Sequence, residues 1–257
     1  DAEPWEIAAA IGERTAAVLW VARDDALPPL EAVVAVAHAA GVPVIVDAAA
    51  ELPPRTNLRR FLAAGADLVA FSGGKALGGP QASGMLCGRR DLVASAALQM
   101  LDMDYLPGTF PAGAGAIDAA ALRGLPPHGI GRPCKVGKEQ IAGLVTALRL
   151  FLARDEAVMR AGWLASLRVI EATAAGLRGL AASLDATGPV PRLVLAVDPA
   201  AAALDARHLF DRLRSGQPRI ETDPGALHAG RLVVDPTCLL DGDADLVGAG
   251  LRAALRG

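Results

Sequence analysis

The chain has 257 residues, of which 53% are hydrophobic and 21% charged, so it can form one large or two smaller domains with a sizeable core. Its formal net charge of -3 lacks the basic excess typical of nucleic-acid-binding proteins. Cys87, Cys134 and Cys238 fit neither a zinc site nor a disulfide framework. We therefore expect no metal, a reducing cytoplasmic location and no membrane span, and Asp1 does not open a signal peptide.

The first seventy residues alternate between apolar runs and amphipathic segments. The predicted strands are continuous apolar runs, at residues 15–21, 42–46 and 66–71. The predicted helices lie before and between these runs, at residues 4–11, 30–40 and 57–64. Asn57 is expected to cap the third helix, and Gly41 and Gly65 to end the second and third. Because strands apolar throughout are typical of sheets covered on both faces, we predict an α/β fold with a mainly parallel sheet.

Two reactive side chains follow these predicted strands. Asp47 ends the second run, and Lys75 lies in a glycine-rich stretch, residues 72–84, directly after the third. Ligands of open α/β sheets bind outside the carboxyl ends of the strands, which makes this edge the candidate site. Two plainer interpretations remain open: Asp47 as a helix or turn cap in the following loop, and Lys75 as a solvated lysine in a glycine-rich turn.

The residue types at this edge suit one cofactor. A desolvated lysine such as Lys75 can form a Schiff base with a carbonyl. A carboxylate such as Asp47 can hold a protonated ring nitrogen, and the two together are what pyridoxal 5'-phosphate requires. The Ser72 hydroxyl and the backbone amides of Gly73 and Gly74 are candidate ligands of its phosphate.

The rest of the chain divides into an irregular segment and a smaller α/β part. Residues 102–132 are rich in glycine and proline, and their length predicts a functional or partner-binding segment. The further predicted helices are at residues 89–101, 136–152, 155–177, 203–213 and 243–255. The further predicted strands are at residues 192–197, 219–222 and 231–234. We predict a cofactor-binding domain over residues 1–150 and a small domain over residues 151–257.

Four blocks of sequence resemble one family. These blocks are Val46–Glu51, Phe71–Lys75, Gly79–Gly84 and Gly131–Glu139. In this order they resemble the bacterial selenocysteine synthase-like group of fold type I pyridoxal-phosphate enzymes. The resemblance implies a fold type I large domain, with Lys75 bound to the cofactor as a Schiff base. It also implies a homo-oligomer, since enzymes of this fold usually build their sites between two subunits.

Two activities within this group are relevant. One is L-seryl-tRNA selenium transferase, whose members tend to carry an acidic residue before the lysine, where this chain has Gly74. The other is a set of amino-acid lyases that includes D-glucosaminate-6-phosphate ammonia-lyase. Gly74 and the lack of basic excess favour α,β-elimination on a small amino acid, phosphorylated or not, and no tRNA partner.

The resemblance also suggests substrate ligands. Arg132 and Lys135 are candidates to hold a substrate carboxylate or phosphate, although a solvated cation pair is an equal alternative. Gln81 is a further candidate for the pocket. Glu51 and His128 are weaker candidates, better explained as a loop carboxylate and a structural histidine. Family members carry an N-terminal portion that has no match here, so the resemblance implies an open sheet edge and exposed apolar surface. An inactive subunit or binding module is therefore the alternative of another class.

Overall fold

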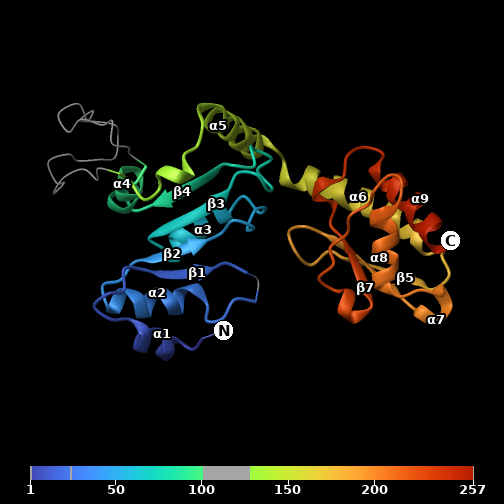
Figure 1. The fold of residues 1–257 in the computed structure, drawn as a ribbon, viewed down its shortest axis with the longest axis horizontal. Coiled ribbons are helices and arrows are strands. Elements are labelled where there is room, and N and C mark those ends of the chain that lie inside the picture. The colour runs from blue at the N-terminus through green and yellow to red at the C-terminus, as the bar shows by residue number, and fades with distance from the viewer. Residues whose placement is uncertain (1, 24, 101–127, 257) are drawn as a thin grey trace. The chain divides into compact units, whose positions relative to one another are not determined.

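The computed structural model describes residues 2–23, 25–100 and 128–256. The contacts among residues divide the chain into two units, Asp1–Ala153 (unit 1) and Arg154–Gly257 (unit 2), and each is described by itself. Figure 1 shows their elements along the chain. The predicted irregular segment 102–132 lies outside the described residues except for residues 128–132.

Unit 1 is built on a four-stranded sheet. Its strands are β1 (Val18–Val21), β2 (Val44–Asp47), β3 (Leu68–Ser72) and β4 (Gly84–Gly88). Its helices are α1 (Pro4–Ala10), α2 (Leu30–Ala39), α3 (Asn57–Ala63), α4 (Arg90–Leu98), the 3₁₀ helix η3 (Arg132–Cys134) and α5 (Lys138–Ala153). The strands follow one another in the order β1-β2-β3-β4 (Figure 1). The first three are parallel and β4 is antiparallel, so the predicted mainly parallel sheet is confirmed.

One face of this sheet carries the core of unit 1. Val44 and Val46 of β2 point to this face and are fully buried. They pack in one cluster with Val33 of α2, Phe61 of α3 and Phe71 of β3. The helices that cover this face are the crossovers that join the parallel strands.

The ends of α2 and α3 follow from local chemistry, with one correction. Gly41 and Gly65 follow these helices with φ of 70° and 102°, as the predicted stops require. The predicted cap at Asn57 is wrong, because Thr56 occupies the N-cap position of α3. Asn57 is buried inside the first turn, and its Nδ2 donates a hydrogen bond of 2.7 Å to Glu51 O. The amide side chain therefore fastens the preceding loop instead of capping the helix.

The other face of the sheet is apolar and open at β1. The prediction of a buried strand at residues 15–21 is wrong in this respect, since Leu19 is 66% and Val21 51% exposed. β1 is one of the two edge strands of this sheet as the described residues form it, and these two side chains point away from the core. A strand sequence shows that both faces are apolar, but not which elements cover them. The exposed apolar surface implied by the family resemblance is thus present.

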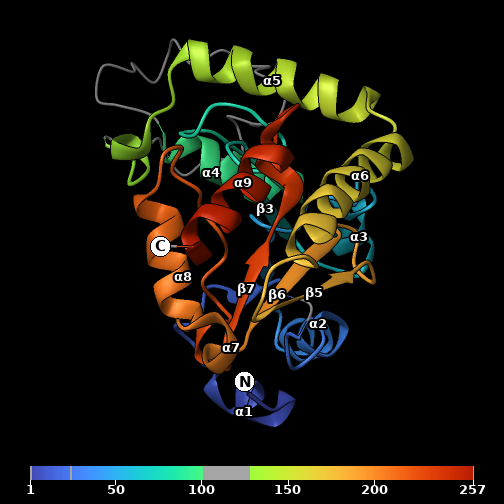
Figure 2. The same ribbon diagram turned by 90° about the vertical axis from the view of Figure 1, so that its right-hand side faces the viewer.

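Unit 2 is a smaller α/β unit with an antiparallel sheet, in the order β5-β6-β7 (Figure 2). Its strands are β5 (Leu180–Asp185), β6 (Arg192–Val197) and β7 (Arg231–Val234). Its helices are α6 (Glu156–Ala174), α7 (Pro199–Ala202), α8 (Ala206–Ser215), η4 (Leu227–Ala229), η5 (Pro236–Cys238) and α9 (Asp243–Arg256). Alternate residues of β6, Leu193 and Leu195, are fully buried in a cluster that includes residues of α6, α8 and α9.

Two strand assignments in unit 2 differ from the prediction. β5 was not predicted, although its residues begin directly after Gly179, which has a φ of 80°. The predicted strand at residues 219–222 is wrong, because the chain there forms only an isolated bridge between Asp223 and Val233. Ile220 is buried between α8 and α9, while Glu221 is exposed and paired with Arg219. Burial of one apolar residue, without a ladder partner, is not enough to make a strand.

Candidate active site at the carboxyl edge of the sheet

Asp47 and Ser72 lie at one edge and on one face of the unit 1 sheet. β2 and β3 run parallel, so both end at the same edge, and Asp47 is in register with Ala70. Ser72 is two residues beyond Ala70 and therefore points to the same face as Asp47, away from the core. Lys75 follows in the loop after β3 and is exposed. The structure thus brings three predicted site residues to the edge where ligands of α/β sheets bind.

The Asp47 carboxylate is half-buried and its orientation is fixed by a turn. Its Oδ1 accepts a hydrogen bond of 3.0 Å from Ala49 N. The next residue, Ala48, donates its backbone N–H to Ala70 O at 2.9 Å, which keeps the turn on the sheet. The plain interpretation of Asp47 as a turn cap is therefore correct. A turn of this kind also holds the carboxylate in one direction, which a role toward a cofactor requires.

The loop that carries Lys75 is closed by its own backbone. Gly73 N donates to Ser83 O at 2.9 Å, and Gly79 N donates to Gly73 O at 2.8 Å. A third bond of 2.8 Å runs from Gly78 N to Lys75 O, and Gly78 has a φ of 70°. These bonds define one conformation for the backbone on both sides of Lys75. The backbone of the loop is thus held by hydrogen bonds, while the Lys75 side chain is exposed, so the interpretation as a solvated lysine stays open.

Gly73 and Gly74 are glycines because the loop is tightly packed. A Cβ on Gly73 would lie 2.1 Å from Ser83 Oγ and 2.8 Å from Leu144 Cδ1. A Cβ on Gly74 would lie 2.6 Å from the Cα of Gln81. The backbone at Gly73 and Gly74 is thus closely approached by other residues of the same chain. Gly73 N is already bonded to Ser83 O, so a phosphate-binding role for Gly73 and Gly74 stays a prediction.

We expect the Gly73→Ala variant to lose stability by about 2 kcal/mol, because the added methyl group must displace Ser83 and Leu144. Urea unfolding of unit 1, followed by circular dichroism, measures the loss. Gly12→Ala is the matched control, since a Cβ on Gly12 meets no atom within 4 Å. Equal stability of the two variants would show that the loop rearranges around a methyl group at residue 73 without a loss of stability.

The predicted substrate ligands fall on two segments. Gln81 belongs to the Lys75 loop, where it is exposed and packs against Gly74. Arg132 lies in η3, which is tied to the end of α4 by a 2.8 Å bond from Gly131 N to Gln99 O. Lys135 follows η3 and is exposed. The substrate-binding roles of Gln81, Arg132 and Lys135 stay predictions.

A buried carboxylate at the opposite edge of the sheet was missed by the sequence analysis. Asp67 lies just before β3 and is only 6% exposed. Its Oδ2 accepts from Val44 N and from His38 Nε2, each at 2.8 Å, and its Oδ1 accepts from Arg89 Nη1 at 3.0 Å. Burial by itself raises the pKa of the Asp67 carboxyl, but these hydrogen bonds outweigh it and the pKa lies below its ordinary value. The sequence signal that could have identified Asp67 is the presence of an acidic residue inside the apolar run of residues 66–71.

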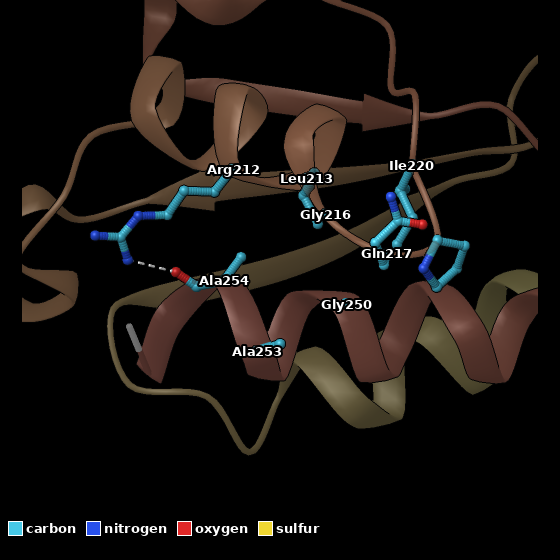
Figure 3. Close-up of a pocket in the computed structure, with 9 residues that line it drawn as sticks. Arg212, Leu213, Gly216, Gln217, Ile220, Gly250, Ala253 and Ala254 are labelled. Carbon is cyan, nitrogen blue, oxygen red and sulfur yellow. Dashed lines mark hydrogen bonds between the residues drawn. The ribbon is translucent and has the colours of Figure 1, made fainter.

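Unit 2 contains a hollow of about 250 Å³ between α8 and α9 (Figure 3). Leu213 and Ile220 form its apolar part, and Arg212 Nη1 donates to Ala254 O at 2.7 Å. The predicted site residues do not line this hollow. In the part of the chain that the structure describes, none of the helices is both long and apolar enough to span a membrane.

Comparison with known proteins shows which family and which proteins the chain resembles. The model of the L-seryl-tRNA selenium transferase family matches residues 26–106, which include β2, β3, Asp47 and Lys75. This segment of the chain is similar to that family. The chain is 38% identical over 250 residues to a 5'-C-glycyluridine monooxygenase-decarboxylase of Streptomyces, covering 94% of this chain and 55% of that protein. It is 30% identical over 255 residues to the D-glucosaminate-6-phosphate ammonia lyase of Salmonella typhimurium, covering 96% and 59%.

The solved structure of a D-glucosaminate-6-phosphate ammonia-lyase has the same fold. It matches 99% of this chain and 61% of its own chain, with a TM-score of 0.73 and 29% identity. The predicted family resemblance and the fold type I architecture are therefore confirmed. The chain spans about 55–61% of the length of these three proteins.

Proposed function

We propose that the chain is a pyridoxal-phosphate-dependent amino-acid lyase that catalyses α,β-elimination on a small amino acid. The observation that carries the proposal is the shared edge and face of Asp47 and Ser72, with Lys75 in the loop directly after Ser72. Its similarity to a D-glucosaminate-6-phosphate ammonia lyase over 96% of the chain supports elimination as the reaction. We also propose a cytoplasmic homo-oligomer.

The donor set at this edge fits pyridoxal phosphate. It offers an amine in Lys75, a carboxylate in Asp47 and a hydroxyl in Ser72, all at the end of two adjacent strands. When bound, the cofactor would supply an electron sink for negative charge at the substrate α-carbon. The fixed Asp47 carboxylate would face the ring nitrogen and keep it protonated, and Ser72 would donate to the phosphate.

The chain's own residues would handle the substrate and its proton. The Lys75 amine would take the α-proton from the substrate, as a base that lies on an ordered loop. Arg132 and Lys135 would bind the substrate carboxylate or phosphate, and Gln81 would add an uncharged hydrogen-bonding group beside the lysine. After the β-group has left, water would hydrolyse the remaining carbon–nitrogen bond, which gives ammonia and a keto acid.

The test is a cofactor and product assay. The purified chain is mixed with pyridoxal phosphate, and the visible absorption band of lysine-bound cofactor is recorded. Ammonia and keto acid are then measured with D-glucosaminate 6-phosphate and with serine derivatives. The same assays are run on the chain co-expressed with the portion of a relative that it does not match. Lack of the band in both preparations would contradict the proposal.

Two alternative reactions have support from the comparisons. The family model favours L-seryl-tRNA(Sec) selenium transfer, which predicts binding of seryl-tRNA in a filter assay. The net charge of -3 weighs against that partner. The relative with 38% identity is named as a monooxygenase-decarboxylase, so release of CO₂ with uptake of oxygen, in place of ammonia, would favour that chemistry.

An inactive subunit or binding module is the alternative from another class. The exposed Leu19 and Val21 on the edge strand support it, because such surface is typical of a contact with another polypeptide. If only the co-expressed preparation binds the cofactor, this chain is one part of an active assembly. If neither binds it while a stable complex forms, the binding-module interpretation is favoured.

A further inference from the structure

The loops that follow β2 and β3 rest on the same helix. The loop of residues 48–56 begins directly after Asp47, and the loop of residues 73–83 contains Lys75. Both loops contact α5, which lies about 70 residues further along the chain than Lys75. Asp47 and Lys75 are therefore linked through α5, which belongs to neither loop.

The Lys75 loop meets α5 through apolar and backbone contacts. Leu77 is 1% exposed and forms a cluster with Leu144 and Phe151 of α5. A Cβ on Gly79 would lie 3.3 Å from Ala147 Cβ, and one on Gly143 would lie 2.7 Å from Pro80 Cγ. The loop backbone and the helix backbone thus approach as closely as glycine allows. A contact of this kind leaves little room for independent movement.

The Asp47 loop joins the same cluster and adds a polar contact. Leu52 of the loop and Leu58 of α3 pack against Leu77, Leu144 and Phe151. Arg55 Nη1 donates to Leu152 O at 2.5 Å, in the last turn of α5. The last carbonyl groups of a helix lack partners within it, so a cation there both satisfies an acceptor and complements the helix dipole.

We propose that Arg55 is a positioning residue: it fastens the Asp47 loop to α5, the helix on which the Lys75 loop packs, and so fixes the two loops relative to each other. Its meaning for catalysis rests on the proposed function, because Asp47 and Lys75 must hold one cofactor from two strands. Arg55 is suited to this because it lies in the first loop and its guanidinium bonds the helix that packs on the second. Small displacements of catalytic groups lower the reaction rate strongly in active sites.

The first test is amide hydrogen exchange of the cofactor-free chain. In Arg55→Gln, we expect exchange at Ala49 and Glu51 and at Gly73 and Gly79 to accelerate together by about fivefold. Arg55→Lys keeps a cation near the helix end and should restore at least half of the protection. Arg59→Gln is the matched control, an exposed arginine of α3 whose replacement should change neither loop.

Faster exchange confined to residues 48–56 or to the last turn of α5 would overturn the proposal. It would show that Arg55 stabilises its own surroundings and does not couple the loops. Equal exchange in Arg55→Gln and wild type would overturn it as well. These results need no bound cofactor, so they stand whether or not the proposed function is correct.

The second test uses the cofactor band of the loaded protein. In Arg55→Gln, we expect the pH midpoint of the band to shift by at least about half a unit, because Asp47 and Lys75 no longer hold their relative position. Arg55→Lys should shift it less, and Arg59→Gln not at all. An unchanged midpoint would contradict positioning. Lack of the band in the wild-type chain, both alone and co-expressed with the portion of a relative that it does not match, would instead contradict the proposed function.

Discussion

Replacing Lys75 with alanine is expected to remove the visible band of bound cofactor and to lower elimination by at least about 10³-fold. The reason is that the proposal assigns both the covalent attachment and the proton transfer to this one amine. The loop around Lys75 is held by backbone bonds that do not involve the side chain, so the fold should be unaffected. Absorption spectra, product assays and urea unfolding of the variant measure the three effects.

Two matched variants sharpen this experiment. Lys75→Arg keeps a positive charge but offers no amine for the attachment, so it should be as inactive as the alanine variant. Lys138→Ala removes an exposed lysine at the start of α5, outside the proposed site, and should keep full activity. If Lys75→Ala retains the band, another lysine binds the cofactor, and Lys135 becomes the first candidate.

Replacing Asp67 with alanine is expected to destabilise unit 1 by about 2–3 kcal/mol at pH 7. The substitution leaves Val44 N without its buried acceptor and removes the partner of His38 and Arg89. Asp91→Ala is the matched control, since Asp91 bonds the same Arg89 but its side chain is 62% exposed. That exposed pair is screened by solvent, so the Asp91→Ala variant should lose much less stability than Asp67→Ala. Urea unfolding at pH 7 compares the variants.

The contribution of Asp67 should depend on pH in a defined direction. Its pKa is lowered in the folded protein despite burial, through the bonds from Val44, His38 and Arg89. The folded state therefore gains stability above the unfolded carboxyl pKa of about 4, and loses it as pH falls through the lower folded value. The stability difference between wild type and Asp67→Ala should narrow when unfolding is measured at pH 3. A difference that stays constant would show that the Asp67 carboxyl has the same pKa in the folded and the unfolded state.

The sequence alone predicted that Asp47 and Lys75 follow strand ends, and it could do so for a local reason. Apolar runs that end on Asp47 and before Lys75 mark strand ends, and parallel strands place such ends at one edge. The structure has β2 and β3 parallel, with Asp47 in register with Ala70. The stops at Gly41 and Gly65 were equally local, because a positive φ is a property of one residue. Short-range rules of this kind need no knowledge of the rest of the fold.

What the sequence could not decide depended on distant residues. The exposure of Leu19 depends on whether a second layer covers the sheet, and a strand's own residues do not contain that information. The role of Asn57 depends on Glu51 O, and the failure of residues 219–222 to form a strand depends on missing ladder partners. In each case a contact across the fold overrode a local preference.

The sequence determined which residues of this protein carry the proposed chemistry, and the tertiary structure decided what holds them in place. Gly73 and Gly74 were predicted to bind the phosphate of a cofactor, yet the space that a Cβ would take at these glycines is occupied by Ser83, Leu144 and Gln81. Arg55 carried no signal in the sequence, and only the folding of α5 onto two separate loops brings it to Leu152 O. Reactive groups are recognised by their type and their place at a strand end, which are local properties. Their support comes from packing between segments far apart in the chain, which only the tertiary fold defines.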